Sequence, residues 1–309
     1  MQAAFIFPGQ GSQSVGMMAG FSGLPIVKDT FTEASDLLGV DLWSLVAQGP
    51  VEQINQTVNT QPLMLAAGVA IYRAWLDIGG LKPAWLAGHS LGEYSALVAA
   101  GALAFQDAVP LVRFRAQAMQ EAVGEGVGGM AAILGLDDAL VRAACAEAAQ
   151  GEVLEAVNLN CPGQVVIAGH RAAVERGIEA AKAKGAKRAV LLPVSVPSHC
   201  ALMRPAAQRL SAYLDQVQIV APRIPVLHNA DVIAHEDPAA IKQALVAQLY
   251  SPVRWVETVR ALAAKGVTHV VECGPGKVLA GFSKRIDVEL QSLVLTDSQT
   301  LTEAKAALI

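Results

Sequence analysis

A serine between two glycines, at the junction of an apolar run and a helix-forming run, constrains the fold of this chain most strongly. Residues 84–87 (AWLA) predict a buried strand, and residues 91–100 (LGEYSALVAA) predict a helix that follows almost immediately. Ser90 then lies on the sharp strand-to-helix turn of a G-x-S-x-G nucleophile elbow. Gly88 and Gly92 permit this turn because a side chain at either position would crowd the neighbouring backbone.

This turn has a chemical and a structural interpretation. The Ser90 hydroxyl would project at a helix N-terminus, where free N–H groups and the helix dipole favour negative charge. The N–H of Leu91 is then placed to receive an oxyanion. The structural alternative is a helix N-cap serine between packing glycines, because serine is a favoured cap.

Size and composition indicate a globular protein with one large domain or two. The chain has 309 residues, of which 53% are hydrophobic and 16% charged. It contains no run of 18 apolar residues that would predict a membrane span. The N-terminal MQAAFIFPGQ lacks a basic region and predicts a strand rather than a signal peptide. The net charge of −4 argues against general nucleic-acid binding.

Cysteine usage indicates a reducing compartment. Cys145, Cys161, Cys200 and Cys273 are scattered and show no metal-ligand spacing. We therefore expect reduced thiols, no bound metal and a cytoplasmic location.

The order of predicted elements indicates an α/β fold with an inserted unit. Residues 127–196 follow the order β-α-β-β-α-β of a ferredoxin-like subdomain, with a helix cap at Asp137 or Asp138. Around it, the predicted strands are 3–7, 84–87, 224–229 and 268–272, and the predicted helices are 28–47, 51–59, 62–78 (starting at Pro62), 106–123, 238–250 and 254–265. The glycine-rich turn after the first strand, PGQGSQ, matches neither a Walker loop nor a dinucleotide fingerprint.

A serine nucleophile needs a base, and histidine is the usual one. His199 is the best placed of the six histidines, because it lies in a proline-restrained loop where the inserted unit returns the chain to the core. The other five are interpreted as structural residues: His89, which should point away from Ser90, His170, His228, His235 and His269.

Five separated segments carry a family resemblance: FPGQGSQ, GHSLGEYSALVAAGAL, VPSHC, QLYSPVRW and ECGPGKVL. Together they resemble the malonyl-CoA:acyl carrier protein transacylases, which load malonyl groups in bacterial fatty acid synthesis. The resemblance extends over nearly the whole chain. It implies an α/β-hydrolase-like core formed by residues 1–126 and 197–309, with the ferredoxin-like subdomain of residues 127–196 inserted into it.

The resemblance also implies roles for single residues. Ser90 would be the acylated nucleophile and His199 its general base and acid, while the backbone N–H groups of Gln10 and Leu91 would form the oxyanion hole. Gln248 would offer the carbonyl that holds His199. The sequence shows no obvious triad acid between Ser90 and His199, and a neutral carbonyl stabilises an imidazole cation less than a carboxylate does.

Two further residues would contact the acyl group. The resemblance assigns Arg115 to the free carboxylate of malonate and Asn160 to the lining of the cleft. Helix geometry also favours Arg115 over Arg113, because positions two apart are rotated by roughly 200°. Arg115 shares its side of the helix with apolar residues, so it should face the core. The structural alternative is a surface arginine lying over apolar neighbours.

The implied reaction is a ping-pong transfer from malonyl-CoA to the phosphopantetheine thiol of acyl carrier protein, with no metal or redox cofactor and no membrane or nucleic-acid partner. The same residues would serve an acyltransferase of a polyketide synthase or a malonate decarboxylase. A serine esterase or lipase would instead need a carboxylate partner for the histidine and an apolar acyl pocket. Arg115 argues against that alternative.

Clustered cations suggest where an acidic carrier protein would dock. Residues 170–188 hold six cations and two carboxylates, a local surplus of four positive charges. We expect docking through Lys182, Lys187 and Arg188, with a second edge at Lys277, Lys284 and Arg285. The structural alternative is an ordinary solvated helix face.

Overall fold

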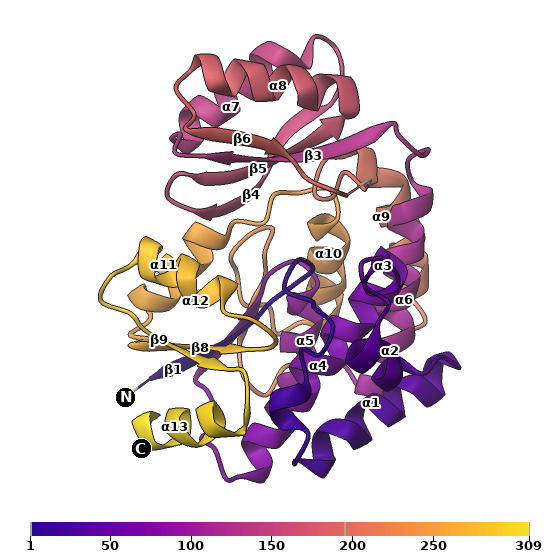
Figure 1. The fold of residues 1–309 in the computed structure, drawn as a ribbon, viewed down its shortest axis with the longest axis vertical. Helices are drawn as coiled ribbons and strands as arrows, with labels where there is room; N and C mark the ends of the chain where they lie inside the picture. Colours follow the sequence, from indigo (N-terminus) through magenta and orange to yellow (C-terminus); the bar gives the residue numbers. More distant parts are fainter. Residues whose placement is uncertain (1, 195, 309) are drawn as a thin grey trace.

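The larger part of the molecule is built on a parallel sheet of five strands (Figure 1). The computed structural model describes residues 2–194 and 196–308. The strand order is β7-β2-β1-β8-β9, and every neighbouring pair is parallel. The bounds are Ala3–Phe7 for β1, Trp85–Gly88 for β2, Val226–Leu227 for β7, His269–Cys273 for β8 and Gln291–Leu295 for β9.

Helices cover both faces of this sheet, as a parallel sheet requires. Successive side chains of β1 show the two faces: Phe5 and Phe7 pack against α4 and α5, whereas Ala4 and Ile6 pack against α11 and α12. The helices around the sheet are α1 (Pro25–Leu38), α2 (Leu42–Gln48), α3 (Val51–Ile54), α4 (Thr57–Asp77), α5 (Gly92–Ala99), α6 (Phe105–Glu121), α9 (Arg204–Leu214), α10 (Pro238–Gln248), α11 (Trp255–Ala264), α12 (Val278–Ile286) and α13 (Ser298–Leu308). None of the described helices has the length and apolar character needed to span a bilayer.

The predicted inserted unit forms a separate antiparallel sheet at one end of the molecule (Figure 1). Its strands are β3 (Gly128–Leu134), β4 (Leu154–Cys161), β5 (Gln164–His170) and β6 (Arg188–Leu191), in the order β4-β5-β3-β6. Helices α7 (Asp138–Ala149) and α8 (Arg171–Ala183) pack on one face. This element order and strand order are those of a ferredoxin-like unit, so the predicted fold class is confirmed.

Helix α4 begins five residues before the predicted start, and Pro62 lies inside it. Proline removes a donor from the helix, and the carbonyl that loses its partner four residues back is that of Val58. Arg113 replaces the missing donor, because its guanidinium bonds to the Val58 carbonyl at 3.1 Å and to the Asn59 side chain at 3.0 Å. The predicted helix start at Pro62 was therefore wrong. The helix continues N-terminal to the proline because Arg113, from α6, supplies the missing donor.

The predicted strand 224–229 is also shorter in the structure, where β7 contains only Val226 and Leu227. The next two residues leave the sheet edge because His228 and Asn229 are hydrogen-bonded to the buried carboxylate of Glu93. This departure brings Asn229 to the carboxyl edge of the sheet.

Candidate active site

The Ser90 elbow lies at the carboxyl edge of the parallel sheet, between the end of β2 and the start of α5. Ser90 has a φ of +52°, in the left-handed region that side chains rarely adopt. A Cβ on Gly88 would lie 1.9 Å from the Gly92 carbonyl carbon, and one on Gly92 would lie 2.0 Å from the Phe7 carbonyl oxygen. Both glycines are therefore required by close backbone approach.

The N-cap alternative for Ser90 is wrong. Leu91, not Ser90, occupies the N-cap position of α5, and no side-chain hydrogen bond caps that helix. The Ser90 hydroxyl instead lies 2.7 Å from Nε2 of His199. The serine side chain is thus directed toward a base and away from the helix backbone.

His199 is held in the tautomer that a general base needs. Its Nδ1 lies 2.7 Å from the carbonyl oxygen of Gln248, and a carbonyl can only accept, so Nδ1 carries the proton. The backbone N–H of His199 donates to the Leu249 carbonyl at 3.0 Å. In the neutral ring, Nε2 is then free to accept the proton of the Ser90 hydroxyl.

Burial lowers the pKa of His199 to about 3, and the positive charge of Arg115 acts in the same direction. His89 is affected similarly, since burial lowers its pKa to about 4. Both rings are therefore neutral near pH 7, which is the form of His199 that can remove a proton.

This shift predicts an unusual pH dependence for acylation of Ser90. We expect the rate to stay level from about pH 7.5 to about pH 5, because an ordinary histidine titrates near 6.5 but His199 stays neutral. The free energy of unfolding should fall as the pH drops below about 6.5, because the unfolded chain binds the proton more readily. Rapid-quench mass spectrometry of the acyl adduct measures the rate, and a half-loss near pH 6.5 would contradict the assignment.

Arg115 lies on the inner face of α6 and is 1% exposed. Its guanidinium donates to Gln61 Oε1 at 2.8 Å, to Gln248 Oε1 at 2.9 Å and to the Ser90 hydroxyl at 3.3 Å. Arg113, on the opposite side of the helix, is occupied with the backbone of α4. A cation thus lies beside the elbow serine in the interior of the protein.

The expected oxyanion donors come from two loops that touch. Gly9 approaches so closely that a Cβ on it would lie 2.4 Å from the His89 carbonyl oxygen and 3.6 Å from the nitrogen of Leu91. The next residue, Gln10, lines the same cavity as Ser90 and Leu91. Within the described chain, neither of these two backbone N–H groups donates a hydrogen bond, so both are free for a ligand oxygen.

The cavity around Ser90 has a volume of about 490 Å³ and lies between the core and the small sheet. Met130, Leu192 and Val194 line it from the side of the small sheet. Asn158 also lines it, whereas Asn160 does not: its Oδ1 lies 2.8 Å from Nε2 of His89. Strand β4 has irregular register on both sides of Leu159, so alternation along the strand does not decide which asparagine faces the cavity.

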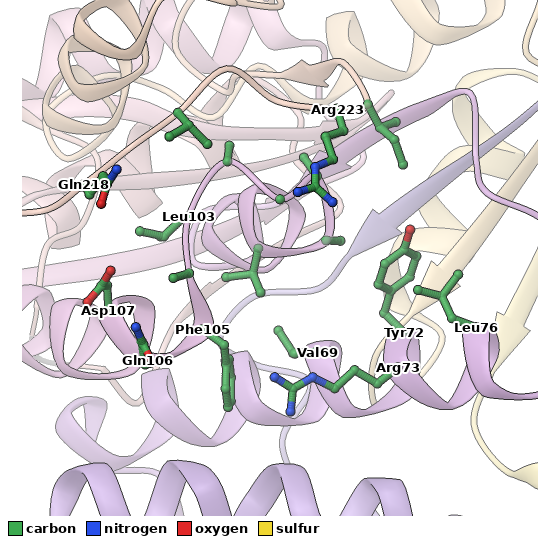
Figure 2. A pocket seen from close by; sticks show the side chains of 18 of the residues that line it. Val69, Tyr72, Arg73, Leu76, Leu103, Phe105, Gln106, Asp107, Gln218 and Arg223 are labelled. Carbon is green, nitrogen blue, oxygen red and sulfur yellow. The ribbon is translucent and has the colours of Figure 1, made fainter.

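A second cavity of about 600 Å³ lies beside the far end of α5 (Figure 2). Arg73, Asp107 and Arg223 are among its polar residues, and no serine, cysteine or histidine is among the residues that line it. Cys200, which follows His199 in the chain, is not suited to act as a nucleophile: burial raises its pKa to about 12, and its thiol donates to the Pro197 carbonyl. Of these two cavities, only the one around Ser90 is lined by both a serine and a histidine.

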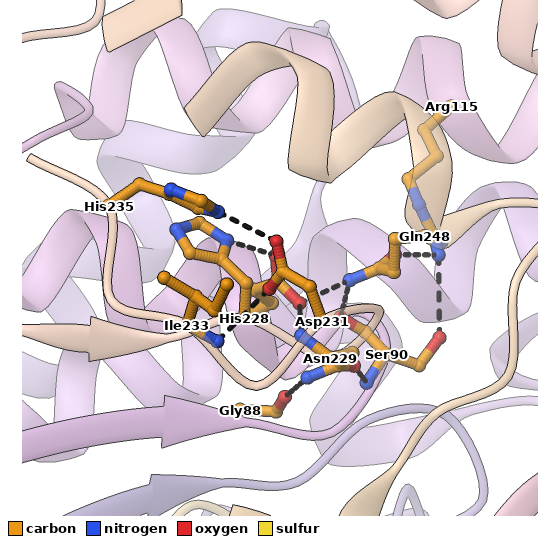
Figure 3. Close-up of polar contacts among 10 residues, drawn as sticks. Gly88, Ser90, Arg115, His228, Asn229, Asp231, Ile233, His235 and Gln248 are labelled. Carbon is orange, nitrogen blue, oxygen red and sulfur yellow. Dashed lines mark hydrogen bonds and ion pairs between the residues drawn. The ribbon is translucent and has the colours of Figure 1, made fainter. Parts of the chain in front are cut away.

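Three residues that sequence reasoning missed complete the site. Gln61 holds Arg115, and Glu93 binds Asn229 and Gln248. Asn229 accepts from the backbone N–H of Ser90 at 2.7 Å (Figure 3). Asn229 follows a strand end, the position where ligand-binding residues of parallel sheets gather, and this signal could have identified it.

The basic face predicted on residues 170–188 has a smaller surplus of positive charge than the count of charged residues within the segment suggested. Four of its six cations lie in ion pairs: Arg171 with Glu175, Arg176 with Glu152, Lys182 with Glu179 and Lys184 with Glu147. Glu147 and Glu152 lie outside the segment, and tertiary packing brings them to it. The surplus is therefore two charges rather than four, and Lys187 and Arg188 have no ion-pair partner among the described residues.

The two predicted basic edges meet at one end of the small sheet. Arg285 donates to the Pro162 carbonyl at 2.7 Å, and the adjacent Gly163 carbonyl accepts from the N–H of Gly135 at 2.8 Å. A Cβ on Gly135 would lie 2.6 Å from Cγ of Lys187, so the lysine packs directly against that turn. The guanidinium of Arg285 is thus engaged within the protein, while Lys277 and Lys284 are exposed.

An elbow serine bonded to a buried histidine, with unpaired backbone donors and an interior arginine, defines a serine-dependent acyl-transfer enzyme. Residues 4–286 match the family model described as the acyl transferase domain. The chain belongs to the family of malonyl CoA-acyl carrier protein transacylases. Relatives of that name from Salmonella typhimurium and Escherichia coli K12 are each 57% identical over 98% of both chains.

Solved structures of similar proteins superimpose on nearly the whole of this chain. An acyl-carrier-protein S-malonyltransferase from Burkholderia pseudomallei superimposes with a TM-score of 0.98, at 60% identity, covering 99% of this chain and 100% of that one. A malonyl-transacylase in complex with its type II polyketide synthase acyl carrier protein also has a TM-score of 0.98, at 52% identity and with the same coverage. The fold predicted from the sequence is therefore that of the family.

Proposed function

We propose that this enzyme moves a malonyl group from malonyl-CoA to the phosphopantetheine thiol of acyl carrier protein through a malonyl-Ser90 intermediate. The observation that supports it most is the 3.3 Å contact between the buried Arg115 guanidinium and the Ser90 hydroxyl, which line the same cavity. A buried cation beside the nucleophile suits an acyl group that ends in a carboxylate, because arginine can pair with both carboxylate oxygens. A simple esterase has no use for this charge.

In the first half-reaction, the Ser90 oxygen attacks the thioester carbonyl and its proton passes to Nε2 of His199. The carbonyl oxygen becomes an oxyanion, which accepts from the N–H groups of Gln10 and Leu91. The C–S bond then breaks, and His199 returns the proton to the departing CoA thiolate. Malonyl-Ser90 and free CoA are the products of this half.

The second half-reaction runs the same steps with a different thiol. His199 takes the proton of the phosphopantetheine thiol, and the sulfur attacks the carbonyl of malonyl-Ser90. The Ser90 oxygen leaves and recovers the proton from His199. Every proton transfer uses the same imidazole, so we propose that the reaction needs no metal or redox cofactor.

The function is tested by intact mass spectrometry after mixing the enzyme with malonyl-CoA. We expect a covalent adduct of malonyl mass that disappears when a carrier protein bearing phosphopantetheine is added. Transfer to water instead of the carrier would indicate a hydrolase. A wild-type enzyme that forms no adduct would overturn the proposal.

The carrier protein, acidic by analogy with the family, is expected to dock on a basic strip formed by Lys187, Arg188, Lys277 and Lys284. These residues are exposed, and the chain of contacts from Arg285 to Lys187 joins the two edges. Lys182, which the sequence also suggested, is paired with Glu179 and contributes less. With four buried, unpaired cysteines in the chain, we expect this encounter in the cytoplasm.

Replacing both Lys187 and Arg188 with glutamate should raise the apparent KM for the carrier protein by about tenfold and leave that for malonyl-CoA unchanged. Charge reversal on a rim mainly slows association, so the effect should shrink as salt is added. Reversal of the paired Lys182 and Lys184 is the matched control and should have a smaller effect. Equal effects on both substrates would remove the strip from the docking surface.

A further inference from the structure

Glu93 places a carboxylate in the interior directly behind the elbow. It is the second residue of α5, and its side chain has no solvent exposure. A buried carboxylate is costly unless donors surround it. Oε2 accepts from the backbone N–H of Asn229 and from Nε2 of Gln248, both at 2.9 Å, and Oε1 lies 2.7 Å from Nδ1 of His228.

The first of these partners holds the elbow itself (Figure 3). The Asn229 side chain accepts from the N–H of Ser90 at 2.7 Å and donates to the Gly88 carbonyl at 2.6 Å. These two bonds hold the backbone at Ser90, the residue with the positive φ, and at Gly88, two residues before it. Glu93 in turn fixes the backbone of Asn229, so the left-handed conformation of Ser90 is held from behind.

The second partner, Gln248, contacts every other reacting group. Its side-chain amide donates to the Ser90 carbonyl at 3.0 Å as well as to Glu93, and its Oε1 accepts from Arg115. Its backbone carbonyl orients His199. Displacing this side chain would therefore remove contacts to the nucleophile residue and to the arginine, at the residue whose backbone carbonyl holds the base.

Charge decides the orientation of the Gln248 amide. Its oxygen faces the cation of Arg115 and its NH₂ faces the anion of Glu93. The flipped amide would put donor against donor and acceptor against acceptor. Arg115 has no carboxylate within ion-pair distance among the described residues, so Glu93 balances its charge through this amide.

We propose that Glu93 is a positioning residue for the transfer reaction, whose carboxylate fixes Ser90 through Asn229 and fixes His199 and Arg115 through Gln248. The proposal rests on the proposed function of the same site. It also accounts for the lack of a triad acid in contact with His199. The negative charge is on Glu93, and Gln248 lies between this carboxylate and the histidine. An anion there favours the imidazolium that forms as Ser90 attacks.

The test replaces Glu93 with glutamine, which has the same size. Its amide oxygen can still accept from Asn229 and Gln248, and its NH₂ can donate to His228 in the other tautomer. We expect the maximal rate of Ser90 acylation by malonyl-CoA to fall roughly 10- to 100-fold, by analogy with the loss seen when a residue that orients a metal ligand is replaced. The malonyl-CoA concentration that gives half the maximal rate should change less than about threefold.

Glu272→Gln is the matched control. Glu272 is also a fully buried glutamate beside the start of a helix, and it accepts from the N–H of Ala280 at 2.8 Å without contacting the reacting groups. The control should acylate Ser90 at the wild-type rate. A Glu93→Gln rate within about twofold of wild type, or an equal loss in both variants, would overturn the proposal.

A second variant covers the case in which Glu93→Gln does not fold. Gln248→Met keeps the backbone carbonyl to His199 but cuts the link between Glu93, Ser90 and Arg115, so it should lose a similar factor. When both single variants fold, the double variant should be no slower than the worse of them, because the residues act as a unit. Fully additive losses, or an unimpaired Gln248→Met, would contradict the proposal. Wild-type enzyme run in parallel must form the malonyl adduct; its failure would count against the proposed function and not against Glu93.

Discussion

Ser90→Ala should form no malonyl adduct, and its transfer rate should fall on the order of 10⁵-fold or more. The expected loss is this large because the covalent intermediate cannot form, and removal of a nucleophile eliminates what its partners contribute as well. His199→Ala should slow both half-reactions, since the same imidazole serves each thiol. Single-turnover acylation and transfer to carrier protein, measured separately, resolve the two halves.

Ser95→Ala is the control for Ser90→Ala. Ser95 lies in α5, the helix that follows the Ser90 turn; it is buried, and its hydroxyl has no hydrogen-bond partner in the described structure. Its removal should leave the acylation rate near that of wild type. Continued malonyl exchange between CoA and a thiol by the Ser90 variant, at near the wild-type rate, would show that the mechanism is wrong.

Arg115→Ala should lose most malonyl transfer while keeping, or gaining, acetyl transfer. Truncating one partner of a buried, hydrogen-bonded charge pair costs about 2–5 kcal/mol, so malonyl loading should fall roughly 30- to several-thousandfold. Acetyl has no carboxylate to lose, and the variant removes a charge that opposes protonation of His199. Loading of malonyl and acetyl from their CoA esters, measured side by side, gives the change in preference.

Arg113→Ala separates the charge at the site from disturbance of the helix. Arg113 bonds to the Val58 carbonyl that Pro62 leaves without a helical donor, so this variant should lower the melting temperature. Its preference for malonyl should not change. An unchanged malonyl preference in Arg115→Ala, or the same shift in both variants, would refute the assignment of the carboxylate to Arg115.

Local pattern was sufficient for much of the fold. The G-x-S-x-G turn predicted the strand, the helix and the glycines at 88 and 92, because steric crowding of a sharp turn involves only close neighbours. The order β-α-β-β-α-β likewise predicted the small sheet from periodicity alone. The side of α6 occupied by Arg115 followed from the angle between helix positions, which is a local quantity.

Contacts between distant segments could not be predicted in this way. The start of α4 depends on a donor from Arg113, 55 positions beyond Val58, and the surplus charge on residues 170–188 depends on glutamates outside that segment. Asn158, and not Asn160, faces the cavity because β4 is irregular there. The alternation of apolar and polar residues along one strand does not reveal where its register with the neighbouring strand shifts.

By itself, the sequence determined the class of fold, the nucleophile candidate and the arginine of α6 that faces the core, because each depends on local geometry or on residue chemistry. Only the tertiary structure decided which carboxylate stands behind the base. Glu93 and Gln248 are 155 residues apart in sequence and 2.9 Å apart in space, joined because the chain leaves β7 early and α10 ends beside the elbow. A buried charge must find its donors wherever packing brings them, so its partners are set by the fold as a whole and not by the residues beside it.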